Sequence, residues 1–246
     1  QHPTRGRIAF NLYPFQEKTL TLLDKNDRNI ILKSRQLGIS TLSAGISLWM
    51  MVFQKDKSIL VVATKQDTAK NLVTKVKFMY DNLPSWLQIG FTENNKLALR
   101  LKNGSQVKAV SAASDAGRSE AISLLIVDEA AFIEENRIEE IWGSSQQTLS
   151  TGGRAIVLST PNGTGNFFHK MWVKAEEGTN GFIPIKLHWS LHPERDQTWR
   201  DKQDDELGLR MAAQECDCDF TTSGHTVFEN EMMKFVEETY ICEPVE

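Results

Sequence analysis

Short apolar runs alternate with helical patterns along most of the chain, which is typical of a mainly parallel sheet covered by helices on both faces. Helices are expected over residues 40–53 and 66–82, where apolar residues recur at helical spacing. Two further runs, 97–101 and 106–112, flank Asn103-Gly104, a pair typical of a tight hairpin turn. Buried strands are expected at residues 29–33, 58–64, 123–129, 154–160 and 182–189.

The composition is that of a globular domain and excludes several classes of protein. The 246 residues are 40% hydrophobic and 24% charged, which argues against a disordered tail, a collagen-like repeat or a coiled-coil rod. With 28 basic and 32 acidic residues the net charge is −4, so a stand-alone nucleic-acid clamp is not expected. No run suits a membrane span, and Cys216, Cys218 and Cys242 lack zinc or disulfide spacing, which indicates reduced thiols.

The loop after the first predicted strand is a variant phosphate-binding loop. Residues 33–41 read KSRQLGIST, and a P-loop requires Gly, four residues and then Gly-Lys-Ser/Thr between a strand and a helix. Gly38 and Ser40 occupy the second Gly and the hydroxyl position. Backbone N–H groups in such a loop cradle phosphate, and the Ser40 hydroxyl is placed to reach Mg²⁺.

Two positions of this loop depart from the pattern. Lys33 stands where the first Gly belongs, and Ile39 stands where the phosphate-binding lysine belongs. Either Lys33 or Arg35 must then supply the missing charge from the other side of the loop. The alternative is a Ser/Thr helix cap with solvated basic neighbours.

The third predicted strand ends in Asp128-Glu129, the arrangement of metal ligand and base in a P-loop ATPase. The first carboxylate would hold the Mg²⁺ shell, and the second would orient or deprotonate the attacking water. An acidic pair that caps the following helix is the alternative.

Two weaker signals lie on other loops. The fourth strand ends in STPNG, residues 159–163, which suits either a sensor of the γ-phosphate or a plain Pro/Gly turn. Upstream, Tyr13-Pro14-Phe15-Gln16 offers an amide for the adenine edge. A surface amide beside a core aromatic residue is the alternative there.

Together these motifs resemble the ATPase domain of the large terminase subunit, the DNA-packaging motor of tailed bacteriophages, closest to the T4-like branch. The resemblance rests on Tyr-x-x-Gln, Ser-Arg-Gln-x-Gly-x-Ser, an apolar strand with Asp-Glu-Ala, and Ser-Thr-Pro-Asn-Gly, and it covers about residues 11–228. It implies an α/β fold of the RecA-like P-loop (ASCE) class with a small C-terminal lid. It also implies ATP and Mg²⁺ as ligands, and ATP hydrolysis that moves viral double-stranded DNA into a procapsid.

The resemblance implies roles for individual residues. T4-like members carry Lys at the position of Ile39. In some terminases this lysine looks to have moved to the first position of the loop, and Lys33 fits that alternative. The implied assignments are Gln16 for adenine; Lys33, Ser34, Arg35, Gln36, Gly38, Ser40 and Thr41 for phosphate; Asp128 and Ser40 for Mg²⁺; Glu129 and Arg35 for catalysis; Ser159, Thr160 and Asn162 for coupling; and Arg118 as a second arginine near the site or the subunit boundary.

The resemblance also implies an assembly. We expect a P-loop ATPase core at residues 1–190, a lid and the start of a linker at 191–246, and no C-terminal RNase H-type nuclease domain in this chain, so it should not cut DNA. The implied partners are the portal protein, the small terminase subunit, transiently bound DNA and further copies in a pentameric ring on the procapsid, in the host bacterial cytoplasm and without a membrane.

Three alternatives remain from the sequence. A superfamily 2 helicase shares the Asp-Glu strand but needs a second RecA-like domain, for which the chain is too short. A nucleotide-binding packaging scaffold with little hydrolysis is favoured only by Ile39. Four lysines on the second expected helix could face DNA, although a solvated surface is the simpler interpretation: Lys65, Lys70, Lys75 and Lys77.

Overall fold

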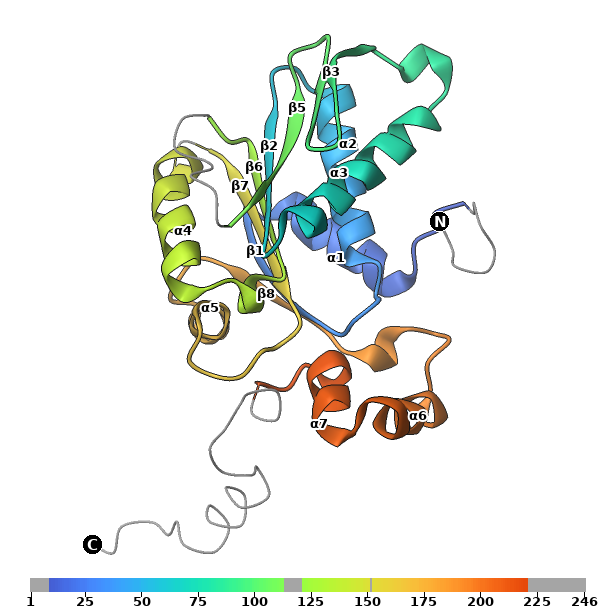
Figure 1. The fold of residues 1–246 in the computed structure, drawn as a ribbon, viewed down its shortest axis with the longest axis vertical. Helices are drawn as coiled ribbons and strands as arrows, with labels where there is room; N and C mark the ends of the chain where they lie inside the picture. The colour runs from blue at the N-terminus through green and yellow to red at the C-terminus, as the bar shows by residue number, and fades with distance from the viewer. Residues whose placement is uncertain (1–8, 113–120, 151, 221–246) are drawn as a thin grey trace, which may run out of the picture.

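The computed structural model describes residues 9–112, 121–150 and 152–220, which form one eight-stranded sheet with helices on both faces (Figure 1). In spatial order the strands are β3 (Phe91–Asn94), β4 (Ala98–Leu101), β5 (Gln106–Ser111), β2 (Ser58–Ala63), β6 (Leu124–Asp128), β7 (Arg154–Ser159), β1 (Arg28–Lys33) and β8 (Ile183–Leu187). The six strands from β5 to β8 are parallel, and β3 and β4 are antiparallel at one edge. The mainly parallel α/β sheet predicted from the sequence is confirmed.

Both faces of the sheet are buried, because successive residues of each strand point to opposite faces and each face meets helices. In β1, Ile31 joins one hydrophobic core, whereas Ile30 and Leu32 join the other. The first core lies under α1 (Pro14–Lys25), α2 (Ile39–Phe53) and α3 (Gln66–Asp81), and the second under α4 (Glu135–Ser150) and α5 (Phe167–Glu176) (Figure 1). This burial explains why the strands read as uninterrupted apolar runs.

The elements predicted from the sequence are confirmed to within two residues at their ends. The predicted hairpin joins β4 to β5, and Gly104 adopts φ 86°, which an L side chain rarely adopts. The Asn103 side-chain amide donates to the carbonyl oxygens of Met51 and Gln54, so the turn also covers the end of α2. Four elements, α1, α4, α5 and β3, lie outside the predicted ranges.

Residues 189–220 form a helical segment that lies beyond one end of the sheet (Figure 1). We refer to it as the C-terminal helical segment. It contains a 3₁₀ turn, Trp189–Leu191, then α6 (Gln197–Leu207), α7 (Leu209–Ala212) and a π-helical turn, Ala213–Asp217. None of the helices in the described residues is long and apolar enough to cross a membrane.

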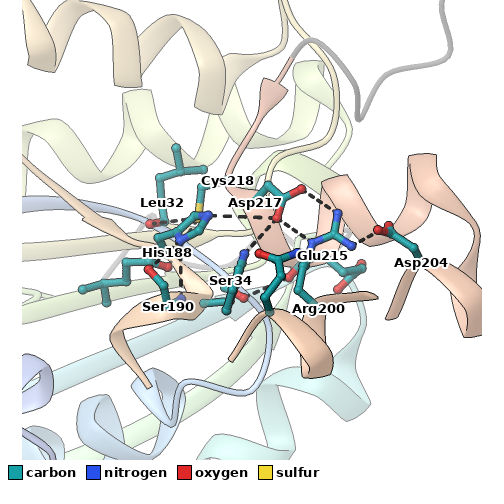
Figure 2. A network of polar contacts seen from close by, with 12 residues as sticks. Leu32, Ser34, His188, Ser190, Arg200, Asp204, Glu215, Asp217 and Cys218 are labelled. Atoms are coloured by element: carbon teal, nitrogen blue, oxygen red, sulfur yellow. Dashed lines mark hydrogen bonds and ion pairs between the residues drawn. The ribbon is translucent and has the colours of Figure 1, made fainter. Parts of the chain in front are cut away.

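Arg200 holds this segment together (Figure 2). Its Nε and Nη2 donate to the two carboxylate oxygens of Asp217 at 2.8 and 2.7 Å, and its Nη1 donates to Asp204. Asp217 also accepts the indole N–H of Trp189 at 3.1 Å. The next residue, Cys218, lies 3.3 Å from the Leu187 carbonyl oxygen at the end of β8, and burial raises the pKa of its thiol to about 12. The guanidinium therefore joins α6 to the chain that returns to the sheet.

We expect Arg200→Ala to destabilise the protein, because it leaves the Asp217 carboxylate without its bidentate partner in a site where Arg200 is only 8% exposed. The loss in the free energy of unfolding should be about 3 kcal/mol, measured by urea unfolding. Lys202→Ala on the same helix is the matched control, since the Lys202–Glu206 pair is exposed and should contribute less than about 1 kcal/mol. Equal losses in the two variants would contradict this prediction.

Candidate functional site

Three polar loops meet at one edge of the sheet because the parallel strands end in register. Leu32 of β1 lies opposite Ser159 of β7, and Asp128 of β6 lies opposite Leu158 of β7. The residues that follow these three strands therefore converge beyond the carboxyl edge, where open α/β sheets bind their ligands. The polar clusters found in the sequence at the ends of the first, third and fourth predicted strands are brought together here.

The loop between β1 and α2 presents a row of backbone N–H groups. Gln36 and Gly38 adopt left-handed conformations, with φ 59° and 76°, and such residues turn successive N–H groups into a concave nest. Among the described residues, none accepts a hydrogen bond from the N–H groups of residues 36–40. Five adjacent donors at the N-terminus of a 15-residue helix make an anion site of the kind that holds phosphate.

Gln16 of α1 lies beneath this loop. Its Nε2 donates to the Leu37 carbonyl oxygen at 2.9 Å, and its Oε1 accepts the backbone N–H of Tyr13 at 3.0 Å. A Cβ atom on Gly38 would approach Nε2 to 2.7 Å, so a larger residue would displace the Gln16 amide and would also be strained at φ 76°. Gln16 is 3% exposed, so the alternative of a surface amide is wrong. Its contact with adenine stays a prediction, which would have to use the remaining amide N–H.

Ser40 and Asp128 meet across the edge of the sheet. The Ser40 hydroxyl donates to Asp128 Oδ2 at 3.0 Å, and Asp128 Oδ1 accepts the backbone N–H of Glu129 at 3.0 Å. A hydroxyl and a carboxylate are hard oxygen ligands, and Mg²⁺ is commonly held by one or two such groups, with water and phosphate completing its shell. The donor set therefore fits the metal ion that the motif implies.

Glu129 has a strained backbone. Its φ of 55° and ψ of 40° are left-handed values that cost a non-glycine residue about 1 kcal/mol or more. Such strain persists only where the surroundings enforce it, and it clusters at functional sites. The left-handed turn ends β6 at once and gives the half-buried Glu129 a different direction from the strand residues before it.

The loop after β7 is hydrogen-bonded to the turn that follows Glu129. The Ser159 hydroxyl accepts the backbone N–H of Ala131 at 3.1 Å, and the Asn162 amide donates to the Ala131 carbonyl oxygen at 3.0 Å. Thr160, which lies between these two residues in the sequence, is also buried, with 6% of its surface exposed. Ser159 and Asn162 therefore bind both polar groups of one peptide residue only two positions after Glu129.

Comparison with known proteins identifies the family. The model of the family described as terminase large subunit, T4likevirus-type, N-terminal, matches residues 30–235. The chain belongs to this family.

Solved large terminases share the fold. A mutant form of the ATPase domain from Thermus phage P74-26 superposes with a TM-score of 0.69 at 20% identity, over 86% of this chain and 95% of that one. The large terminase of bacteriophage HK97 gives a TM-score of 0.66 at 19% identity, over 96% of this chain and 48% of that one. The large terminase of a thermophilic bacteriophage, in complex with ADP, gives 0.68 at 11% identity, over 85% and 54%. The chain thus matches about half the length of the last two proteins.

In this large-terminase domain, Ile39 faces the core. Its side chain is 1% exposed and belongs to the hydrophobic core under α1, α2 and α3, so it anchors the first turn of α2. The two cations nearest in sequence have different surroundings. Lys33, at the end of β1, is half-buried and has no ion-pair partner among the described residues. The Arg35 side chain is 67% exposed and lies 3.5 Å from the Glu215 carboxylate.

Lys75 is a further cation that the sequence analysis missed. With Lys65, Lys70 and Lys77 it was expected to face DNA or solvent, and it is half-buried, as are Lys70 and Lys77. Burial lowers the pKa of Lys75, while the charge of Asp128 raises it and the charge of Lys33 lowers it further. Side chains lean toward the N-terminus of their helix, which for α3 is the end next to the carboxyl edge of the sheet. Lys75 is therefore close enough to the site to interact with Asp128 and Lys33.

The remaining predicted site residues have clear positions, apart from one. Ser34 is fully buried and its hydroxyl lies 3.3 Å from the Glu215 carbonyl oxygen (Figure 2). Gln36 is exposed, and Thr41 is half-buried in the first turn of α2. Arg118 lies outside the described residues.

We expect Ile39→Lys, which restores the usual lysine, to destabilise the protein because it places an ammonium group in the core. The free energy of unfolding without nucleotide should fall by about 3 kcal/mol in urea unfolding. Ile39→Met keeps the volume and the apolar character, and should cost less than about 1.5 kcal/mol. Unchanged stability together with tighter ATP binding in Ile39→Lys would show instead that a side chain here reaches the phosphates.

Proposed function

We propose that this domain hydrolyses ATP to drive viral double-stranded DNA into a procapsid. The observation that carries the proposal is the hydrogen bond between Ser40 and Asp128 at 3.0 Å, directly beside the five donors of residues 36–40. This is the arrangement in which a P-loop holds the phosphates and the adjacent strand holds the metal ion. Membership of the large-terminase family, and the fold shared with the ADP complex of the thermophilic phage terminase, support it.

In the proposed mechanism, the N–H groups of residues 36–40 bind the phosphate chain of ATP, and Lys33 adds positive charge from the end of β1. Ser40 and Asp128 would hold Mg²⁺, which neutralises charge on the β- and γ-phosphates when bound. Glu129 orients the water for in-line attack on the γ-phosphate. Its left-handed backbone, which turns the side chain away from the direction of the strand, supports this role.

Charge that spreads over the γ-phosphate in the transition state needs a further cation. Arg35 serves in cis in this proposal, and an arginine from a neighbouring subunit, for which Arg118 is the candidate, is the alternative. The contact between Arg35 and Glu215 is long, at 3.5 Å, and the Arg35 side chain is exposed, so little would oppose its turning toward a nucleotide.

Ser159, Thr160 and Asn162 would couple hydrolysis to movement. Because Ser159 and Asn162 hold Ala131, a change at Glu129 on loss of phosphate is passed within two residues to the loop after β7. We further propose that residues 1–190 form the motor core and 191–246 the lid and linker. The assembly would be a pentameric ring with the portal protein and small terminase, in the host cytoplasm, and DNA cleavage would belong to a separate nuclease domain.

A nucleotide-binding scaffold with little hydrolysis is the second candidate function, and the buried Ile39 is the observation that favours it. ATP turnover with and without DNA separates it from the motor.

Glu129→Gln should abolish most of the magnesium-dependent ATP turnover, because the amide cannot accept a proton and orients water poorly. We expect kcat to fall by about a hundredfold or more, measured by phosphate release, with ADP affinity within about twofold of the wild type. Glu134→Gln, beyond the same turn and exposed, is the matched control. Unchanged turnover in Glu129→Gln would show that this carboxylate is not catalytic.

Lys33→Ala should weaken ATP binding by about tenfold or more, because it removes a half-buried cation next to the phosphate loop. Displacement of a fluorescent nucleotide measures this loss of affinity. Arg35→Ala, in contrast, should lower kcat more than it lowers ATP affinity. If Lys33→Ala binds ATP normally while Arg35→Ala or Lys75→Ala does not, the charge comes from that other residue.

A further inference from the structure

Arg195 reaches the phosphate loop from the C-terminal helical segment. Its Nη1 donates to the Arg35 carbonyl oxygen at 3.0 Å and its Nη2 to the Gln36 carbonyl oxygen at 3.4 Å, across sequence separations of 160 and 159 residues. The guanidinium also lies over the ring of Trp199, 4.3 Å from its centroid, and burial lowers the pKa of Arg195. A fork of two donors is thus fixed on two consecutive loop carbonyls.

This contact determines which way the loop's N–H groups point. In a planar trans peptide, the C=O of one residue and the N–H of the next point in opposite directions. Because Arg195 holds the carbonyls of Arg35 and Gln36 on its own side of the loop, the N–H groups of Gln36 and Leu37 must face the other side. Neither N–H has a hydrogen-bond partner among the described residues, and both belong to the proposed phosphate cradle.

Gln16 extends the same arrangement by one peptide. It binds the Leu37 carbonyl oxygen at 2.9 Å, so the N–H of Gly38 faces away from Gln16. Three consecutive carbonyls, of residues 35–37, therefore have side-chain donors, and the three N–H groups that follow them remain free among the described residues. The charge of Arg195 also polarises the peptides after Arg35 and Gln36 and strengthens their N–H groups as donors.

We propose that Arg195 is a positioning residue for nucleotide binding: it holds the peptides after Arg35 and Gln36 so that their N–H groups face the phosphates. The inference rests on the proposed function, since it assumes that these N–H groups bind a nucleotide. It also gives the C-terminal helical segment a direct influence on the loop, because movement of this segment would release the two carbonyls.

Arg195 is separable from the residue that holds the segment together. Arg200 binds Asp217 and Asp204 within the segment, and none of its hydrogen bonds reaches the phosphate loop. If Arg195 only stabilised the segment, its replacement would lower the free energy of unfolding, as we expect for Arg200, without a separate effect on nucleotide affinity. If it positions the loop, its removal lowers nucleotide affinity more than stability.

The test compares Arg195→Ala, Arg195→Lys and Arg200→Ala with Lys202→Ala as the surface control. Calorimetry with MgADP measures affinity, urea unfolding measures stability, and steady-state ATP turnover separates KM from kcat. We expect Arg195→Ala to weaken ADP binding and raise KM by about tenfold, the effect of about one charge-assisted hydrogen bond, with kcat within about threefold. Arg195→Lys keeps the charge but not the fork, and should recover part of the affinity.

The test depends on which variant loses more ADP affinity and which loses more stability. The proposal requires Arg195→Ala to lose more ADP affinity than Arg200→Ala, although Arg200→Ala loses more stability. ADP affinity within twofold of the wild type in Arg195→Ala, or a greater loss in Arg200→Ala, would overturn it. A wild-type chain that binds no MgADP would overturn the proposed function itself, and this inference with it.

Discussion

Five successive backbone N–H groups of the loop after β1 have no acceptor in the described part of the chain, and much of the carboxyl edge is arranged to allow this. An unpaired backbone donor costs free energy once it is buried, so a ligand that covers this row must accept its hydrogen bonds. Here the left-handed Gln36 and Gly38 bend the loop, and Gln16 and Arg195 hold its carbonyls from outside. The N–H groups are thus oriented before a phosphate binds, because the contacts that hold the loop are made to its carbonyls and leave the N–H groups available.

A continuous chain of contacts runs from this cradle to the loop after β7. Ser40 binds one oxygen of Asp128, whose other oxygen binds the N–H of Glu129, and the turn that follows is held by Ser159 through Ala131. The first and last of these links join different strands or loops, so a shift at one end acts on a hydrogen bond to the next segment. This makes the edge of the sheet suited to transmit a change in phosphate occupancy.

Local sequence predicted the strands, the cradle and the Asp128-Glu129 pair because each is encoded within a few residues. The parts that could not be predicted depend on contacts between distant segments. Gln16 meets Leu37 across 21 residues, and Arg195 meets Arg35 across 160, so neither leaves a spacing pattern in the chain. The interaction of Lys75 with Asp128 could not be predicted for the same reason, because it depends on how α3 packs against the sheet.

The substitution at Ile39 changes the source of positive charge at the site. A lysine here would have to leave the first turn of α2 and cross the loop, whereas Ile39 packs into the core and fixes that turn. In the proposed mechanism the positive charge would then come from the end of β1, through Lys33, and from α3, through Lys75. Burial and the charge of Lys33 both lower the pKa of Lys75, and an anion bound beside the two lysines would offset both effects. The pair of lysines would therefore favour phosphate binding electrostatically in the proposed mechanism, even though the usual lysine is absent.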